Sequence, residues 1–178
     1  MRISAEETTC IIIDYQEKIL PAMAEKEQLI ENSVKMLNGL KILGIPMVMT
    51  TQYSKGLGIN VPEIREAAGM EESIDKATFS CADSREVCNA IQGKKNVIIC
   101  GIEAHVCVLQ TIIDLKAMGY QPILVEDCVS SRKLHDKEIA LIRARDEGAV
   151  ITTYESLLFE LTRVSGTDTF KQISRLVK

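Results

Sequence analysis

Short apolar runs alternate along the chain with longer segments whose apolar residues recur every three to four positions. Residues Thr8–Ile13 form a continuous apolar run, the kind that is buried on both faces of a parallel sheet. A helical pattern covers Gln28–Leu43, and Gly44 ends it before a second predicted strand at Pro46–Thr51. A period of two that gives way to one near 3.6 predicts a strand followed by a helix.

The same order of strand, helix, glycine and strand repeats through the rest of the chain. Helices are predicted at residues 85–92, 107–118 and 136–145, and strands at 96–100, 122–126 and 149–152. Asp83 is expected to cap the first of these helices, and Thr152 and Thr167 are expected to cap two more near the C-terminus. Strands that alternate with helices of this length imply right-handed crossovers and a parallel sheet covered on both faces.

One segment departs from this order. Residues 53–68 contain Gly56, Gly58 and Pro62, which predict a surface loop running into a short helix. Residues 71–76 are then expected to form a short third strand. No linker or low-complexity tract divides the chain, and 178 residues are enough to bury one core, so we expect a single domain over residues 1–178.

Composition and charge narrow the class of protein. A hydrophobic fraction of 46% and a charged fraction of 26% are ordinary for a globular chain, and the net charge of −4 gives no basic surface for nucleic acid. We find no signal-peptide pattern and no apolar run long enough to span a bilayer, so no membrane contact and a cytoplasmic location are expected. The six cysteines contain no Cys-x-x-Cys pair, which argues against zinc and favours free thiols in a reducing compartment.

Reactive side chains stand at the carboxyl ends of three predicted strands. These residues are Asp14, Lys76 and Cys107. Because parallel strands end on one edge of a sheet, the three side chains are expected at the same edge. Cys107 falls in the first turn of a helix, where amide dipoles are expected to lower the pKa of its thiol. A nucleophile, a base and a positive group are what an amide or ester hydrolase needs.

The residue types alone leave structural roles open. A free cysteine is often a core residue, an aspartate that closes a strand is often a turn residue, and a lone lysine is usually solvated. His105 lies two positions before Cys107, but neighbouring loop side chains seldom face one another, so a Cys–His dyad is not favoured. Asp127 also follows a predicted strand, where bracing the turn is the simpler role.

Three blocks of sequence resemble the signature motifs of the isochorismatase-like cysteine hydrolase superfamily. They are Ile-Ile-Asp14-Tyr-Gln, then Asp75-Lys76 followed by Phe79-Ser80, then Gly101-Ile102-Glu103-Ala104-His105-Val106-Cys107-Val108. Their order and wide spacing match over essentially the whole chain. The resemblance implies an α/β chain with a single-domain, three-layer α/β/α Rossmann-like fold. Its six-stranded, mainly parallel sheet would have the strand order 3-2-1-4-5-6.

The resemblance also implies a role for each matching residue. Cys107 would be the nucleophile and Asp14 its general base, while Lys76 would stabilise the thiolate and orient Asp14. A cis peptide bond is expected between Ile102 and Glu103. It would aim the Glu103 N–H, together with that of Cys107, at an oxyanion.

Two departures from the family pattern narrow the activity. Nicotinamidase-like members bind a metal through histidines after the second strand, where this chain reads Thr51-Gln52-Tyr53-Ser54, so neither a metal nor another cofactor is expected. Isochorismatases that cleave a vinyl ether commonly lack the cysteine, so the retained Cys107 favours acyl transfer. The run from Gln52 to Gly58, with Val61-Pro62-Glu63, resembles isochorismatase-domain proteins of unassigned substrate.

These patterns predict a cofactor-free hydrolase that cleaves a C–N (amide-type) or ester bond of a small molecule through an acyl-cysteine intermediate. Three further side chains are expected to contact the substrate: Gln52, Tyr53 and Phe79. Two alternatives stay open, namely vinyl-ether hydrolysis and a non-catalytic or redox-sensing protein that serves as an oligomeric interaction module. The resemblance favours a homo-oligomer, for which four residues are candidates: Leu157, Leu158, Phe159 and Leu161.

Overall fold

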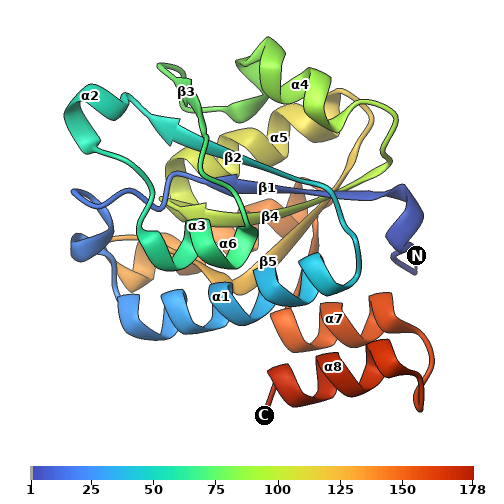
Figure 1. Cartoon of the computed structure of the whole chain (residues 1–178). Coiled ribbons are helices and arrows are strands. Elements are labelled where there is room, and N and C mark those ends of the chain that lie inside the picture. The colour runs from blue at the N-terminus through green and yellow to red at the C-terminus, as the bar shows by residue number, and fades with distance from the viewer. Residues whose placement is uncertain (1) are drawn as a thin grey trace.

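Six parallel strands form one sheet in the order β3-β2-β1-β4-β5-β6, which confirms the predicted strand order (Figure 1). The computed structural model describes residues 2–178. The strands are β1 Thr8–Ile13, β2 Met47–Gln52, β3 Ile74–Lys76, β4 Asn96–Ile102, β5 Gln121–Ser130 and β6 Val150–Thr152. Each is joined to the next strand of the chain by a helical connection, as right-handed parallel crossovers require.

Helices cover both faces of the sheet and make it the middle of three layers. They are α1 Lys26–Ile42, α2 Ser54–Leu57, α3 Pro62–Ala68, α4 Arg85–Ile91, α5 Leu109–Ala117, α6 Leu134–Asp146, α7 Tyr154–Thr162 and α8 Asp168–Leu176. One apolar cluster joins the sheet to α1, α3, α7 and α8, and a second joins its other face to α4, α5 and α6 (Figure 1). The predicted α/β/α architecture is therefore confirmed.

The two central strands pair at their carboxyl ends with no room for a side chain on Gly101. Every residue of β1 and β4 is buried, and the last pair in their register is Ile13 and Gly101. Gly101 has a φ of 138°, and a Cβ added to it would collide with the carbonyl oxygen of Ile13. Only glycine combines this backbone angle with this approach. The close approach sets the end of β4 directly against Asp14, the residue that follows β1.

Helix caps differ from the prediction by one residue in two places. Ser84 and Thr153 accept the capping hydrogen bonds of α4 and α7, in place of Asp83 and Thr152. Asp83 belongs to a preceding 3-10 turn, and Thr152 is the last residue of β6. The predicted cap at Thr167 is confirmed, because its side chain accepts a hydrogen bond from the first turn of α8.

Strand β5 is longer than predicted and carries an irregularity. It continues to Ser130, four residues beyond the predicted end at Glu126, and its register with β4 shifts after Ile99. Asp127 therefore lies within the strand. Its Oδ1 accepts a hydrogen bond of 2.9 Å from the backbone N–H of Tyr154, which braces β5 against the start of α7.

Three of the four apolar residues near the C-terminus belong to the core, so the prediction that they contribute to an oligomer surface is wrong for these three. Leu157, Leu158 and Leu161 are buried on the sheet-facing side of α7. The remaining residue, Phe159, is partly exposed and packs against the ring of Phe170 in α8. The helical period places three of the four leucine and phenylalanine side chains on the inner face of this helix.

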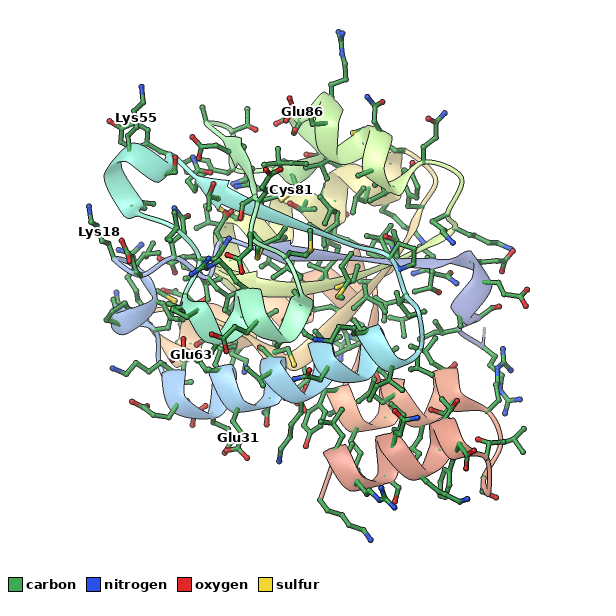
Figure 2. The ribbon with its side chains drawn as sticks, in the orientation of Figure 1. Lys18, Glu31, Lys55, Glu63, Cys81 and Glu86 are labelled. Carbon is green, nitrogen blue, oxygen red and sulfur yellow. The ribbon has the colours of Figure 1, made fainter. Side chains whose placement is uncertain are left out.

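Charged side chains project outward around the three layers, as Figure 2 shows for Lys18, Glu31 and Lys55, while Cys81 lies inside the fold. The longest helix, α1, is amphipathic and packs one face onto the sheet. Within residues 2–178 there is no helix with the length and apolar character needed to cross a bilayer.

We predict that Gly101→Ala lowers the free energy of unfolding by about 3 kcal/mol or more, because a positive φ and a collision with Ile13 both oppose the added methyl group. Gly93→Ala is a matched control, since Gly93 has a φ of 80° and no neighbour within 4 Å of an added Cβ. Its expected cost is ~1 kcal/mol, from backbone strain alone. Urea unfolding measures both, and equal losses would contradict the importance of the close approach.

Candidate active site

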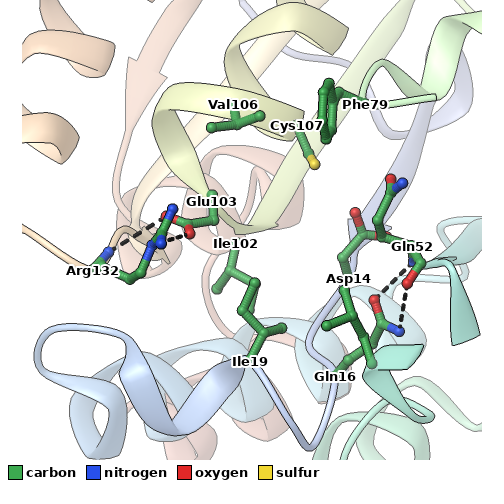
Figure 3. Close-up of a pocket in the computed structure, with 11 residues that line it drawn as sticks. Asp14, Gln16, Ile19, Gln52, Phe79, Ile102, Glu103, Val106, Cys107 and Arg132 are labelled. Carbon is green, nitrogen blue, oxygen red and sulfur yellow. Dashed lines mark hydrogen bonds and ion pairs between the residues drawn. The ribbon is translucent and has the colours of Figure 1, made fainter. Parts of the chain in front are cut away.

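A cavity of about 270 Å³ opens at the carboxyl ends of β1, β2 and β4 (Figure 3). Eleven residues line it: Asp14, Gln16, Ile19, Gln52, Leu57, Phe79, Ile102, Glu103, Val106, Cys107 and Arg132. Ligands of open α/β sheets bind at this edge, where the strand order reverses beside β1. The sulfur of Cys107 faces the space between Glu103 and Asp14 (Figure 3).

Asp14 and Lys76 form a buried ion pair at the base of the site. Asp14 follows β1 with a φ of 56°, and its Oδ2 lies 2.7 Å from the Nζ of Lys76. The other carboxylate oxygen, Oδ1, accepts a hydrogen bond of 2.8 Å from the hydroxyl of Thr50 in β2. Both charged side chains are almost fully buried. Topology thus brings together two residues that stand 62 positions apart in the sequence.

The ammonium group of Lys76 is fully occupied by protein acceptors. Besides Asp14 it donates to the Oε1 of Gln52 at 2.8 Å and to the carbonyl oxygens of Thr78 and Phe79 at 3.3 Å. Burial is the largest influence and acts to lower the pKa of Lys76, but the carboxylate of Asp14 and the thiols of Cys81 and Cys107 together outweigh it, so the pKa is raised. Lys76 therefore stays protonated at neutral pH. It stands behind the cavity wall and does not line the cavity.

Gln52 lines the cavity, but its side-chain amide is already bound to the protein. Its Oε1 accepts from Lys76, and its Nε2 donates to the carbonyl oxygen of Ala77 at 2.8 Å. The side chain of Gln16 holds the backbone of Gln52 in place. Its Oε1 accepts a hydrogen bond of 2.7 Å from the backbone N–H of Gln52, and its Nε2 donates one of 3.0 Å to the backbone carbonyl oxygen of Gln52. Gln52 is therefore arranged to hold Lys76.

Of the other two residues predicted to contact the substrate, Phe79 lines the cavity and Tyr53 does not. Phe79 lines the cavity with its ring about half exposed at the rim. Tyr53 does not line the cavity: it has a φ of 42°, is 60% exposed and precedes α2. Its ring lies over Gly56, where an added Cβ would touch it. The bend that starts α2 turns Tyr53 away and brings Leu57 to the cavity instead.

Cys107 lies in a single π-helical turn, Ala104–Val108, that precedes α5. Only 7% of the residue is exposed, and burial raises the pKa of its thiol to about 12. The positive charge of Lys76 lowers this pKa and the negative charge of Asp14 raises it. The prediction of a lowered thiol pKa is therefore wrong. Loss of water on burial is the largest influence, and together with the nearby carboxylate it outweighs the positive charge of Lys76.

Glu103 is the second buried carboxylate at the cavity. The peptide bond that joins it to Ile102 is cis. Its Oε1 lies 2.6 Å from the Nε of Arg132, while its Oε2 lies 3.6 Å from the Nδ1 of His105. The same ring nitrogen of His105 is within 2.9 Å of the hydroxyl of Ser131. His105 is thus held by Ser131 and Glu103, and its ring is not a partner of the cysteine.

Several lining residues carry no signal in the sequence. Gln16, Ile19, Leu57 and Arg132 lie on loops or short turns that follow the strands. Their positions depend on how each loop folds back over the sheet, which no periodic pattern encodes. Gln16, two positions after Asp14, is the one that proximity to a candidate residue could have suggested.

The charged groups of the cavity are arranged as two paired carboxylates beside one thiol. Asp14 is paired with Lys76, and Glu103 with Arg132. Within the part of the chain that the structure describes, no group of three or more His, Cys, Asp or Glu side chains is arranged to hold a metal ion. Of the two carboxylates, Asp14 is the one whose charge acts on the pKa of the Cys107 thiol.

We predict that Asp14→Asn speeds alkylation of Cys107 by iodoacetamide at mildly alkaline pH, because loss of the carboxylate charge removes one of the causes that raise the thiol pKa. A fall of about one pKa unit gives roughly tenfold more thiolate. In the unmodified protein the rate should keep rising above pH 9.0, the ordinary thiol value. Mass spectrometry of the labelled peptide, with Cys107→Ala as background, measures the rate. An unchanged or slower rate in Asp14→Asn would contradict the charge balance described.

Comparison with known proteins agrees with this architecture. An isochorismatase domain matches residues 8–156. Isochorismatase domain-containing protein 2A of Mus musculus is 35% identical over 180 residues, covering 99% of this chain and 85% of the mouse protein. MAR1 ribonuclease from Caenorhabditis elegans superposes with a TM-score of 0.93 at 35% identity, covering 99% of this chain and 92% of that one. YcaC of Escherichia coli, an octameric hydrolase of unknown specificity, shares the fold with a TM-score of 0.91 at 21% identity, covering 99% and 90%. The chain therefore belongs to the isochorismatase family.

Proposed function

We propose that this protein is a cofactor-free hydrolase that opens an amide-type C–N or ester bond of a small molecule through an acyl-cysteine intermediate. The observation that carries the proposal is the buried pair of Asp14 and Lys76, 2.7 Å apart, at a cavity whose wall includes the thiol of Cys107. Membership of the isochorismatase family, whose members are generally hydrolases, supports the same reaction class.

The raised thiol pKa fits a nucleophile that is deprotonated only as it attacks. The proton of Cys107 passes to Asp14, so that one negative charge moves from oxygen to sulfur and the net charge of the site is unchanged. Lys76 stays positive beside both groups and stabilises either arrangement.

The remaining steps follow with atoms and protons in balance. The sulfur attacks the carbonyl carbon, and the backbone N–H groups of Glu103 and Cys107 stabilise the oxyanion. Collapse of this intermediate breaks the C–N or C–O bond, and protonated Asp14 gives its proton to the leaving group. Asp14 then takes a proton from water, whose oxygen attacks the thioester carbonyl carbon. As the C–S bond breaks, Asp14 gives this proton to the sulfur, which releases the acid and restores the thiol of Cys107 and the carboxylate of Asp14.

The cavity limits the size and character of the substrate. A volume of about 270 Å³ lies near the lower end of the range typical of small-molecule pockets. Most of its wall is apolar, supplied by Ile19, Leu57, Phe79 and Val106. A compact substrate with an apolar body fits this space, because apolar walls with a few polar groups are typical of small-molecule sites.

An RNA substrate is the activity suggested by the name of the Caenorhabditis elegans relative. A polynucleotide needs a basic surface to hold its phosphates, whereas this chain has a net charge of −4. The small volume of the cavity also favours a single small molecule over an extended strand. We therefore place a small-molecule substrate ahead of RNA.

We also propose that the protein forms a homo-oligomer in the cytoplasm. The octameric relative of Escherichia coli supports self-association. Three apolar side chains of α6 stand exposed and offer a surface for it: Leu134, Ile139 and Ile142. Free thiols at all six cysteines are in keeping with a reducing compartment.

We predict that steady turnover of a panel of short amides and esters is abolished in Cys107→Ala. It should fall by about 10²-fold or more in Asp14→Asn and in Lys76→Met, since each removes a group that the proton transfer requires. Cys88→Ala is a matched control, because Cys88 is a partly exposed cysteine outside the cavity wall and should leave turnover unchanged. Mass spectrometry of quenched reactions should find the acyl group on Cys107.

Each alternative gives a different pattern in the same assay. Turnover that survives Cys107→Ala but fails in Asp14→Asn, with a vinyl ether as substrate, would replace the proposal with vinyl-ether hydrolysis. Reversible sulfenylation of Cys107 without turnover of any amide or ester would replace it with a redox-sensing role. Degradation of RNA that depends on Cys107 would overturn the choice of a small molecule.

A further inference from the structure

Arg132 is the one cationic side chain that lines the cavity, within residues 2–178. It follows β5 on the loop that leads into α6, and its side chain is 61% exposed. Its Nε lies against Glu103 at 2.6 Å, and its backbone N–H donates to the other oxygen of the same carboxylate at 3.5 Å. Glu103 thus fixes the base of the guanidinium group at the cavity.

The terminal amino groups of the Arg132 guanidinium are available to donate hydrogen bonds to a ligand. An arginine carries five N–H donors, and the contact with Glu103 is made through the single N–H on Nε. Among the residues that the structure describes, the terminal amino groups of Arg132 donate no hydrogen bond to a protein acceptor. Lys76, the other cation near the site, is buried behind the wall with its donors occupied. An anion in the cavity therefore finds its donors on Arg132.

The positions of the charged groups define a direction for the substrate. Arg132 and Asp14 lie on opposite sides of the cavity, with Cys107 between and above them (Figure 3). The wall between is apolar, with Ile19 and Val106 among its members. A molecule that places its reacting carbonyl at Cys107 thus extends an apolar segment toward Arg132. A planar carboxylate matches the paired N–H groups of a guanidinium.

We propose that Arg132 binds a carboxylate of the substrate, so that the natural substrates are short amides or esters that carry a carboxylate at the end opposite the scissile bond. The proposal rests on the hydrolase function given above and adds the substrate class. Arg132 would act on binding and orientation, because it lies across the cavity from the group that exchanges protons with Cys107. A structural role limited to holding Glu103 would affect charged and neutral substrates alike.

The first test compares matched substrates that differ in charge. Monoamides of malonic, succinic and glutaric acid are assayed beside propionamide, butyramide and pentanamide, in which a methyl group replaces the carboxylate. Arg132→Gln should raise KM for the preferred anionic amide by about tenfold, the loss expected for a charged hydrogen bond, and leave the neutral partner within about twofold. Arg132→Lys should recover part of the loss. Arg143→Gln is the control, because Arg143 is an exposed arginine of α6 outside the cavity.

The second test needs no turnover and therefore separates this proposal from the hydrolase function. Butyrate and 1-butanol are compared for their ability to protect Cys107 from alkylation by iodoacetamide. Butyrate should protect the unmodified protein at about tenfold lower concentration than it protects Arg132→Gln, while 1-butanol should act equally on both. Equal protection of the two proteins by butyrate, or no protection of either, would overturn the proposal whatever the turnover assays show. Equal losses on charged and neutral amides in the first test would also overturn it.

Discussion

The ion pair between Lys76 and Asp14 is the interaction on which the site depends. Two charges are taken out of water here, and such burial is unfavourable unless each group is fully hydrogen-bonded. The structure meets that condition. Thr50 and Lys76 donate hydrogen bonds to the carboxylate, and the ammonium group also donates to Gln52 and to two backbone carbonyl oxygens. Losing one partner of such a pair typically costs about 3–5 kcal/mol, so the pair also ties the ends of three strands together.

The charges of this pair also affect the pKa of the Cys107 thiol. Burial and the carboxylate of Asp14 keep the thiol of Cys107 protonated in the resting protein, and Lys76 only partly offsets them. A thiol of this kind is less open to chance oxidation than an exposed thiolate, because oxidants react with the thiolate form. In the proposed mechanism it becomes nucleophilic when a substrate is in place and Asp14 takes its proton. This balance supports hydrolysis over redox sensing as the role of the cavity.

The sequence predicted the parts of the structure that depend on periodicity and on chain topology. The apolar run before Asp14 and the change of period near Cys107 placed both residues at strand ends, and parallel order placed those ends on one edge. Lys76 could be placed on the same edge of the sheet because a short strand was expected to end at this residue. Resemblance to a known family then assigned roles that residue types alone left open.

Features that depend on packing were beyond the sequence. The direction of the Cys107 pKa shift follows from its burial and its neighbours, and neither is encoded by its place in a helical turn. Arg132 reaches the cavity because β5 runs on to Ser130, past the point where its apolar pattern ends. Leu157 and Leu158 could equally have been surface or core, and only the docking of α7 onto the sheet decides between them.

We propose that the sulfur of Cys107, the carboxylate of Asp14 and the oxyanion donors act on one carbonyl group in one cavity. The most direct measurement is a crystal structure of the protein after reaction with a short aliphatic aldehyde, which forms a thiohemiacetal with a reactive thiol. The account predicts a covalent bond to Cys107, with the new oxygen within hydrogen-bond distance of the N–H groups of Glu103 and Cys107 and with Asp14 in contact with the adduct. An unmodified sulfur, or an adduct whose oxygen points away from those N–H groups, would contradict it.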